Sequence, residues 1–254
     1  MSVLGSGKPP FGDDDGSADP QVAATLAAFA SGVGSEHAAL TALARSRLLV
    51  PVVAVVSEGA GRRTERGDRG SEMSLPTLIG RDGRPAIPAF TCLDALARWD
   101  GQARPVPAPA GRVWRAAVDG GCAVVVDIAG PVPLAIAGSR LAALADGRPV
   151  PPPHRDPDVL AAVRAAADGQ PAIASLRIAG SGPGSGLAGG GDPGVDPAAG
   201  NDLRIDLTLA ARCDAAAGDE AVRLLGRGLM EQLGERLRRG IAIAVSRPAG
   251  DRES

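Results

Sequence analysis

Residues 71–99 have the sequence SEMSLPTLIGRDGRPAIPAFTCLDALARW, and this stretch decides the fold. Short apolar runs predict strands at about Met73–Ile79 and Ala86–Phe90. The Asp82 and Gly83 pair between them suits the tight turn of a hairpin. A capped helix is expected directly after the second strand, so the stretch is typical of a protein of the α+β class.

The same kinds of signal extend the prediction along the chain. The run Leu48–Val56 is nearly all apolar and β-branched, which favours a central strand covered on both faces. Gly130 and Pro131 separate two further apolar runs and predict a second hairpin. Four expected helices begin at side chains that can accept backbone N–H groups, namely Asp19, Ser35, Thr91 and Ser139.

A second α+β unit is expected after the proline run Pro149–Pro153, which should be stiff and extended. Its predicted order is helix, strand, strand, helix, strand. The expected ranges are 158–167 and 219–239 for the helices, with Gly240 as the final cap, and 172–178, 203–209 and 241–245 for the strands.

The predicted organisation has two small domains joined by a linker. Stretches rich in Gly, Pro, Ser and Asp, without apolar periodicity, are expected to be disordered. The parts are a tail (1–18), a first domain (19–146), a Pro-rich linker (147–156), a second domain (157–247) with a disordered insertion (180–201), and a C-terminal tail (248–254).

Composition excludes several classes of function. Aromatic residues make up 2% of the chain, which leaves little to stack nucleic-acid bases. A formal net charge of −2 attracts neither a phosphate backbone nor an anionic membrane. The 3 cysteines form no CxxC pair. The sequence contains no long apolar segment, and no leader peptide is expected. We therefore expect a cytoplasmic protein that binds neither a membrane nor nucleic acid.

Candidate chemistry is sparse. Cys92 is the best candidate for a reactive thiol, because the N-terminus of a helix lowers a thiol pKa, yet a small cap or core residue is the preferred interpretation. His37 and His154, expected at the surface, belong to no metal-binding motif. Residues 184–189 match G-x-G-x-x-G but lack a following helix, so a flexible insertion is favoured over a dinucleotide site. No catalytic residue, cofactor or metal is predicted.

Four segments together resemble a known family. They are ARSRLLVPVVAV (44–55), LPTLIGRDGRPAIPAFT (75–91), CLDALARW (92–99) and AVVVDIAGPVPLAI (123–136). Over residues 20–145 the chain resembles the SseB family, and within it an actinobacterial branch. The family is named for a serine-sensitivity phenotype. The resemblance implies the fold of the SseB N-terminal domain and no particular catalytic residue, cofactor or substrate.

The expected function is that of a non-enzymatic module that binds an unidentified protein partner. The Arg-rich loop and the hairpin after it would supply the interaction surface, with Arg62, Arg63, Arg66 and Glu72 as its candidates. Glu72 also suits an edge position that discourages sheet pairing. Three alternatives stay open: a small-ligand or amino-acid-responsive regulator, a translation-associated accessory factor, and an unrecognised hydrolase or thiol enzyme.

Overall fold

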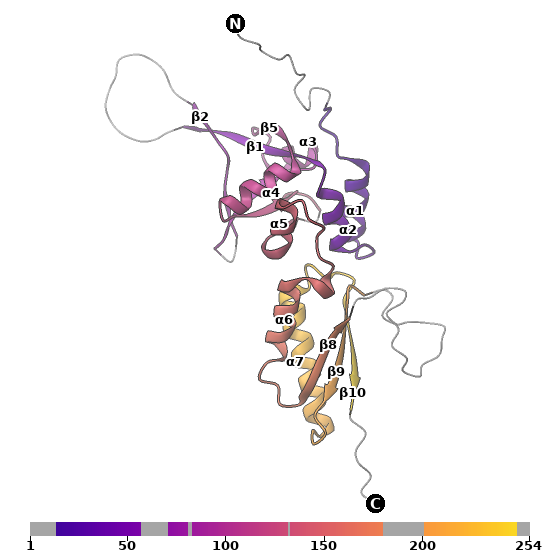
Figure 1. Ribbon diagram of the computed structural model, residues 1–254. Helices are drawn as coiled ribbons and strands as arrows, with labels where there is room; N and C mark the ends of the chain where they lie inside the picture. Colours follow the sequence, from indigo (N-terminus) through magenta and orange to yellow (C-terminus); the bar gives the residue numbers. More distant parts are fainter. Residues whose placement is uncertain (1–13, 57–70, 81–82, 132, 180–200, 248–254) are drawn as a thin grey trace, which may run out of the picture. The chain divides into compact units, whose positions relative to one another are not determined.

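The computed structural model describes residues 14–56, 71–80, 83–131, 133–179 and 201–247. These residues divide into two units (Figure 1). One is drawn from Met1–Ala24 and Ala42–Arg148, the other from Thr25–Thr41 and Pro149–Ser254. Each unit contains both helices and sheet, so the chain has the α+β class that was expected.

The first sheet of the first unit has the strand order β2-β1-β5. Both pairings are antiparallel, and β1 lies at the centre as predicted. The edge strand β5 contains three prolines, which sequence reasoning treated only as a Pro-rich passage. They occupy alternate positions, so the missing N–H groups can all fall on the outer side of the strand. The bounds are Arg47–Val56 for β1, Ser71–Ser74 for β2 and Arg104–Pro109 for β5.

The second sheet of this unit has the order β3-β4-β6-β7. The two predicted hairpins appear in it as the antiparallel pairs β3–β4 and β6–β7. The single strand expected over 73–79 is wrong, because Pro76 interrupts it and its two halves, β2 and β3, pair in different sheets. The bounds are Leu78–Ile79 for β3, Pro85–Ala89 for β4, Ala123–Val126 for β6 and Leu134–Ile136 for β7.

Leu49 and Phe90 join the two sheets of the first unit. Each donates its backbone N–H to the carbonyl of the other, at 2.7 and 2.8 Å. Their side chains are buried together with Leu96, and the Trp99 ring lies 5.5 Å from the Phe90 ring between centroids. The helices of this unit are α3 (Leu93–Trp99), α4 (Ala110–Asp119) and α5 (Gly138–Ala145), of which α4 and α5 pack on each other.

Helices α1 (Pro20–Ala30) and α2 (Glu36–Leu43) each cross a boundary between the units. Their predicted caps are confirmed, since Asp19 Oδ1 accepts the N–H of Gln21 at 2.8 Å and Ser35 Oγ accepts the N–H of Ala38 at 3.2 Å. The expected first domain, 19–146, differs from the first unit because Thr25–Thr41 group with the C-terminal half.

The second unit packs α6 and α7 on one face of a three-stranded sheet of order β10-β9-β8 (Figure 1). Strand β9 alternates buried and half-buried residues, as a strand with one covered face should. The bounds are Pro153–Arg155 for the short helix η1, Pro157–Ala167 for α6, Ile173–Ala179 for β8, Leu203–Leu209 for β9, Ala215–Leu233 for α7 and Ile241–Ser246 for β10.

Three local predictions are corrected by the structure. Helix α7 ends at Leu233 rather than near residue 239, with Gly234 as its C-cap in place of Gly240. Ser139 lies inside α5, whose N-cap residue Ala137 makes no side-chain cap. Residues 14–18, expected to belong to a disordered tail, are held by hydrogen bonds to the first unit.

Candidate functional site

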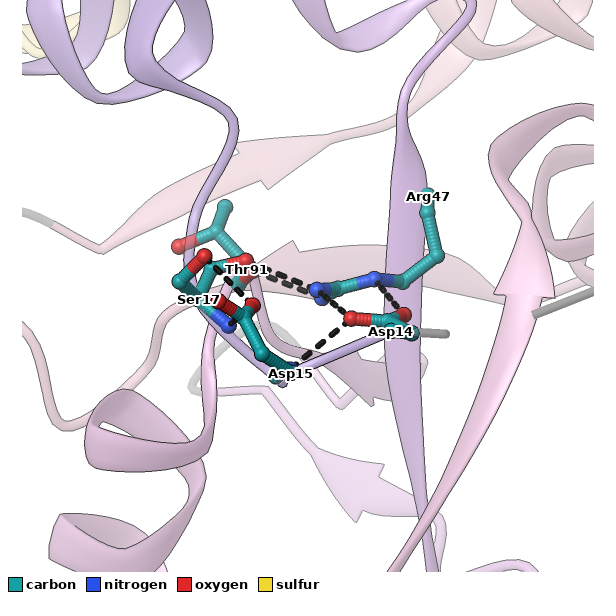
Figure 2. Close-up of polar contacts among 6 residues, drawn as sticks. Asp14, Asp15, Ser17, Arg47 and Thr91 are labelled. Carbon is teal, nitrogen blue, oxygen red and sulfur yellow. Dashed lines mark hydrogen bonds and ion pairs between the residues drawn. The ribbon is translucent and has the colours of Figure 1, made fainter. Parts of the chain in front are cut away.

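Arg47 fixes the N-terminal segment onto the first unit (Figure 2). Its Nη2 donates to Asp14 Oδ1 at 2.6 Å and to the Ser17 carbonyl at 2.7 Å, and its Nη1 donates to the Thr91 carbonyl at 2.9 Å. Its Nε lies 2.5 Å from Asp14 Oδ2, and the two side chains are only 14% and 13% exposed. Each of the three guanidinium nitrogens therefore makes a structural contact.

The turn after Asp14 lies over the start of helix α3. Asp15 Oδ1 accepts hydrogen bonds from the hydroxyl and N–H of Ser17, at 2.6 and 2.9 Å, and these bonds hold the pKa of Asp15 below its ordinary value. Gly16 has a φ of +78° and its carbonyl accepts the N–H of Leu93 at 2.9 Å. A Cβ at Gly16 would lie 2.3 Å from Leu93 Cδ1, so only glycine fits there.

Thr91 does not cap α3, which corrects the sequence prediction. The N-cap residue is Cys92, in an extended conformation and without a side-chain cap. Thr91 instead donates its N–H and its hydroxyl to the two carboxylate oxygens of Asp127, at 2.8 and 2.7 Å. Burial raises the pKa of Asp127, although these hydrogen bonds act in the opposite direction. This carboxylate therefore holds the β6–β7 turn against the end of β4.

A second polar cluster lies within the second unit, around Arg236. Its guanidinium is 3.3 Å from Glu36 Oε2 and 2.5 Å from Asp156 Oδ2, and both carboxylates are buried. His37 follows Glu36, is half-buried, and bonds to the Pro151 backbone; burial lowers its pKa. The charge of His37 also acts on His154, whose pKa is lowered chiefly by burial. Both histidines are thus partly buried and influence each other, and do not lie freely at the surface as expected.

An apolar cavity of about 240 Å³ opens in the first unit between α4 and strands of both of its sheets. Ile87 and Val113 are buried in its wall, whereas Leu75 is 42% exposed. Arg112 is an exposed charged residue of the lining, and it has no ion-pair or hydrogen-bond partner among the described residues. The other lining residues come from several elements: Val50 from β1, Leu75 from the segment after β2, Ile87 from β4, Ala108 from β5, and Val113 and Ala116 from α4.

The interaction residues expected from sequence are only partly placed by the structure. Arg62, Arg63 and Arg66 lie outside the described residues. Glu72 lies in the edge strand β2, opposite Val55 of β1, and its side chain is not described. Leu75, three residues further on, reaches the cavity. Sequence reasoning missed the cavity because its walls come from segments that are far apart in the chain.

The cysteines and the acidic groups do not gather into a site in the described part of the chain. Cys92, Cys122 and Cys213 are free and half-buried, and each lies in a different part of the sequence. The described residues contain no group of three or more His, Cys, Asp or Glu side chains that could hold a metal ion. Among them, too, no helix has the length and apolar character needed to cross a membrane.

Residues 22–143 match the family model described as the SseB protein N-terminal domain. This part of the chain is similar to SseB N-terminal domains. The match includes α1, α2, both sheets of the first unit and most of α5, and thus contains the apolar cavity. No curated protein and no solved structure matches the chain.

Proposed function

We propose that the SseB-type domain is a non-enzymatic protein-binding module and that its apolar cavity receives an aliphatic or aromatic side chain of a partner. The cavity is the observation that carries this proposal. Its 240 Å³ is below the range of a drug-sized ligand pocket and suits a single anchoring side chain. Buried anchors of this kind supply much of the energy of protein interfaces.

The surroundings of the cavity support a macromolecular occupant. Leu75 and Val106 are large apolar residues of this unit with 42% and 45% exposure. Val106 pairs in register with Val50, a cavity residue, so it lies on the same sheet face. The guanidinium of Arg112, which has no partner within the described part of the chain, favours an acidic residue beside the anchor. An apolar centre with a charged rim is typical of a protein interface.

The described acid and base groups support a non-enzymatic role. Asp14 is bound to Arg47, Asp127 to Thr91, and His37 to the Pro151 backbone. The proposal also assigns the protein to the cytoplasm, supported by three free cysteines, and to an actinobacterial branch of the family, supported by the residue pattern.

Cavity-filling variants test this function. The tagged full chain is used to capture partners from its host's lysate, in parallel with Ala116→Phe, which fills the cavity, and Arg112→Glu, which reverses the rim charge. Ala97→Phe, on the exposed face of α3, is the matched control. A partner kept by the control and lost by both cavity variants is expected. A partner kept by all three variants would exclude the cavity as its binding site.

One alternative function has an observation in its favour. The same apolar walls and Arg112 suit a short aliphatic carboxylate, which a small-ligand regulator would bind. Serine itself does not fit well, because the cavity offers its hydroxyl little polar lining. Native mass spectrometry of the purified chain distinguishes the protein-binding module from the small-ligand regulator. A small acid that is bound to the wild-type chain and absent from Ala116→Phe would support the regulator.

A further inference from the structure

A groove of about 640 Å³ lies in the second unit between helix α6 and strand β8. One wall is helical and the other is a strand, and each contributes apolar residues and one arginine. The helix supplies Leu160, Arg164 and Ala167, and the strand supplies Leu176, Arg177 and Ile178.

Strand β8 is an edge strand. In the order β10-β9-β8, its pairing among the described residues is with β9 alone. Alternate residues of an antiparallel strand direct their N–H and C=O groups away from the partner strand. The free side of β8 therefore presents a row of backbone donors and acceptors that a further strand can pair with.

The inner face of β8 gives the groove an apolar base. Leu176 and Ile178 pair in register with Leu207 and Ile205, which are buried under α6 and α7. Leu176 and Ile178 themselves are only partly buried. An added strand would place every second side chain against this apolar base, since side chains alternate between the faces of a strand.

The charge of the groove favours an acidic occupant. Arg164 and Arg177 have no hydrogen-bond or ion-pair partner among the described residues. Asp206 faces Arg177 in register, but its carboxylate lies 2.9 Å from Arg204 Nε. Among the described lining residues, Asp168 is the single carboxylate, and its Oδ1 accepts the N–H of Gly169 at 3.1 Å. The described lining thus carries two guanidinium groups, Arg164 on α6 and Arg177 on the face of β8 opposite Leu176 and Ile178, and one carboxylate.

We infer that this groove is a peptide-binding site. An extended acidic segment of another protein pairs with the free edge of β8, inserts alternate apolar side chains against Leu176 and Ile178, and directs its carboxylates to Arg164 and Arg177. Strand addition beside a helix is an established mode of peptide recognition. The groove lies in the second unit and shares no residue with the apolar cavity, so either proposal can fail without the other.

The test begins with a library of random dodecapeptides displayed on phage and selected on the purified full chain. Enriched peptides are expected to be rich in Asp and Glu and to alternate apolar with polar residues. Their dissociation constants are then measured by fluorescence polarisation with Arg164→Glu, Arg177→Glu and the control Arg223→Glu, an exposed arginine of α7. Each groove variant should weaken binding about tenfold, and the control less than twofold.

The pairing of backbones has its own readout. N-methylation removes backbone N–H donors, and alternate residues of the best peptide form two sets, of which one directs its N–H groups to β8. Binding should be abolished when that set is N-methylated. The bound peptide should also slow hydrogen exchange in β8. No enrichment, peptides without acidic residues, or equal loss in the control would overturn the inference. So would an oligouridylate 12-mer that competes with equal affinity, because it would indicate a general polyanion site.

Discussion

At the scale of single residues, polar groups of the first unit hold together segments that are far apart in the sequence. Arg47 holds Asp14 and the carbonyls of Ser17 and Thr91, and Asp127 holds the N–H and hydroxyl of Thr91. The sequence placed Asp14 in an expected disordered tail and predicted Thr91 as a helix cap. Neither partner could be predicted, because the contacts join residues 33 and 36 positions apart.

Arg47→Met should destabilise the first unit by about 2–4 kcal/mol, because it leaves a buried carboxylate without its partner. Asp14→Asn should cost less, and the double variant less than the sum of the two, since both remove one ion pair. Denaturant unfolding followed by tryptophan fluorescence measures this well, because Trp99 and Trp114 both lie in the first unit. Strictly additive effects would show that the pair is not coupled.

At Asp127, the loss of stability should depend on which residue replaces it. Its φ is +50°, a conformation that Asn tolerates and Ala does not. Asp127→Ala also leaves the Thr91 N–H and hydroxyl without acceptors, so it should cost about 2–4 kcal/mol. Asp127→Asn keeps one acceptor and the backbone preference and should cost about half as much. Equal losses in the same fluorescence assay would contradict this account of the turn.

At the scale of elements, the hairpins and two of the four predicted helix caps, at Asp19 and Ser35, were predictable because their signals are local. The two caps each depend on a few adjacent residues, and the Asp82 and Gly83 pair predicted the β3–β4 pairing, although Asp82 itself lies outside the described residues. Two errors came from tertiary context. The strand over 73–79 was divided between two sheets, and the apolar stripe of the last helix continued to Leu237 although the helix ended before it.

Helix α7 offers a matched pair of glycines. A Cβ at Gly226 meets nothing within 4 Å, so Gly226→Ala should stabilise the second unit by about 0.5–1 kcal/mol. A Cβ at Gly218 would lie 2.8 Å from Leu209 Cδ1, so Gly218→Ala should be neutral or destabilising. Thermal unfolding followed by circular dichroism compares the two. A gain at Gly218 equal to that at Gly226 would mean that Leu209 moves aside freely.

At the scale of the whole molecule, the two histidines should make the second unit sensitive to acid. Burial lowers the pKa of His37 and of His154 below the ordinary value of 6.5. As the pH falls through 6.5, the unfolded chain takes up protons before the folded chain does, so stability falls with pH. Protonation of both histidines would also place positive charges near each other and near Arg155.

Hydrogen exchange in α7, measured between pH 7.5 and 5.5 and corrected for intrinsic rates, tests this. The wild-type protection should decline with falling pH, and the decline should be smaller in His37→Gln/His154→Gln. Burial raises the pKa of Asp202, which has the opposite effect on stability, but this group is common to both proteins. An unchanged decline in the double variant would assign the acid sensitivity to other groups.

The candidate site itself could be predicted only in outline. Sequence directed attention to the hairpin region around Glu72, and Leu75 of that region does line the cavity. The other walls could not be foreseen, because Val50, Ile87 and Val113 converge only through sheet pairing and helix packing. The groove beside β8 was missed for the same reason, since an edge strand is defined by its neighbours and not by its own residues.

The most direct test of the binding module is photo-crosslinking from the cavity mouth in living cells. p-Benzoylphenylalanine is placed at position 75 and, as a control, at position 118, since Leu75 and Val118 are exposed to similar extents, 42% and 40%. The account predicts a discrete protein adduct from position 75 that is absent from position 118 and lost when Ala116→Phe is added. Adducts of equal yield from both positions, or none from position 75, would contradict it.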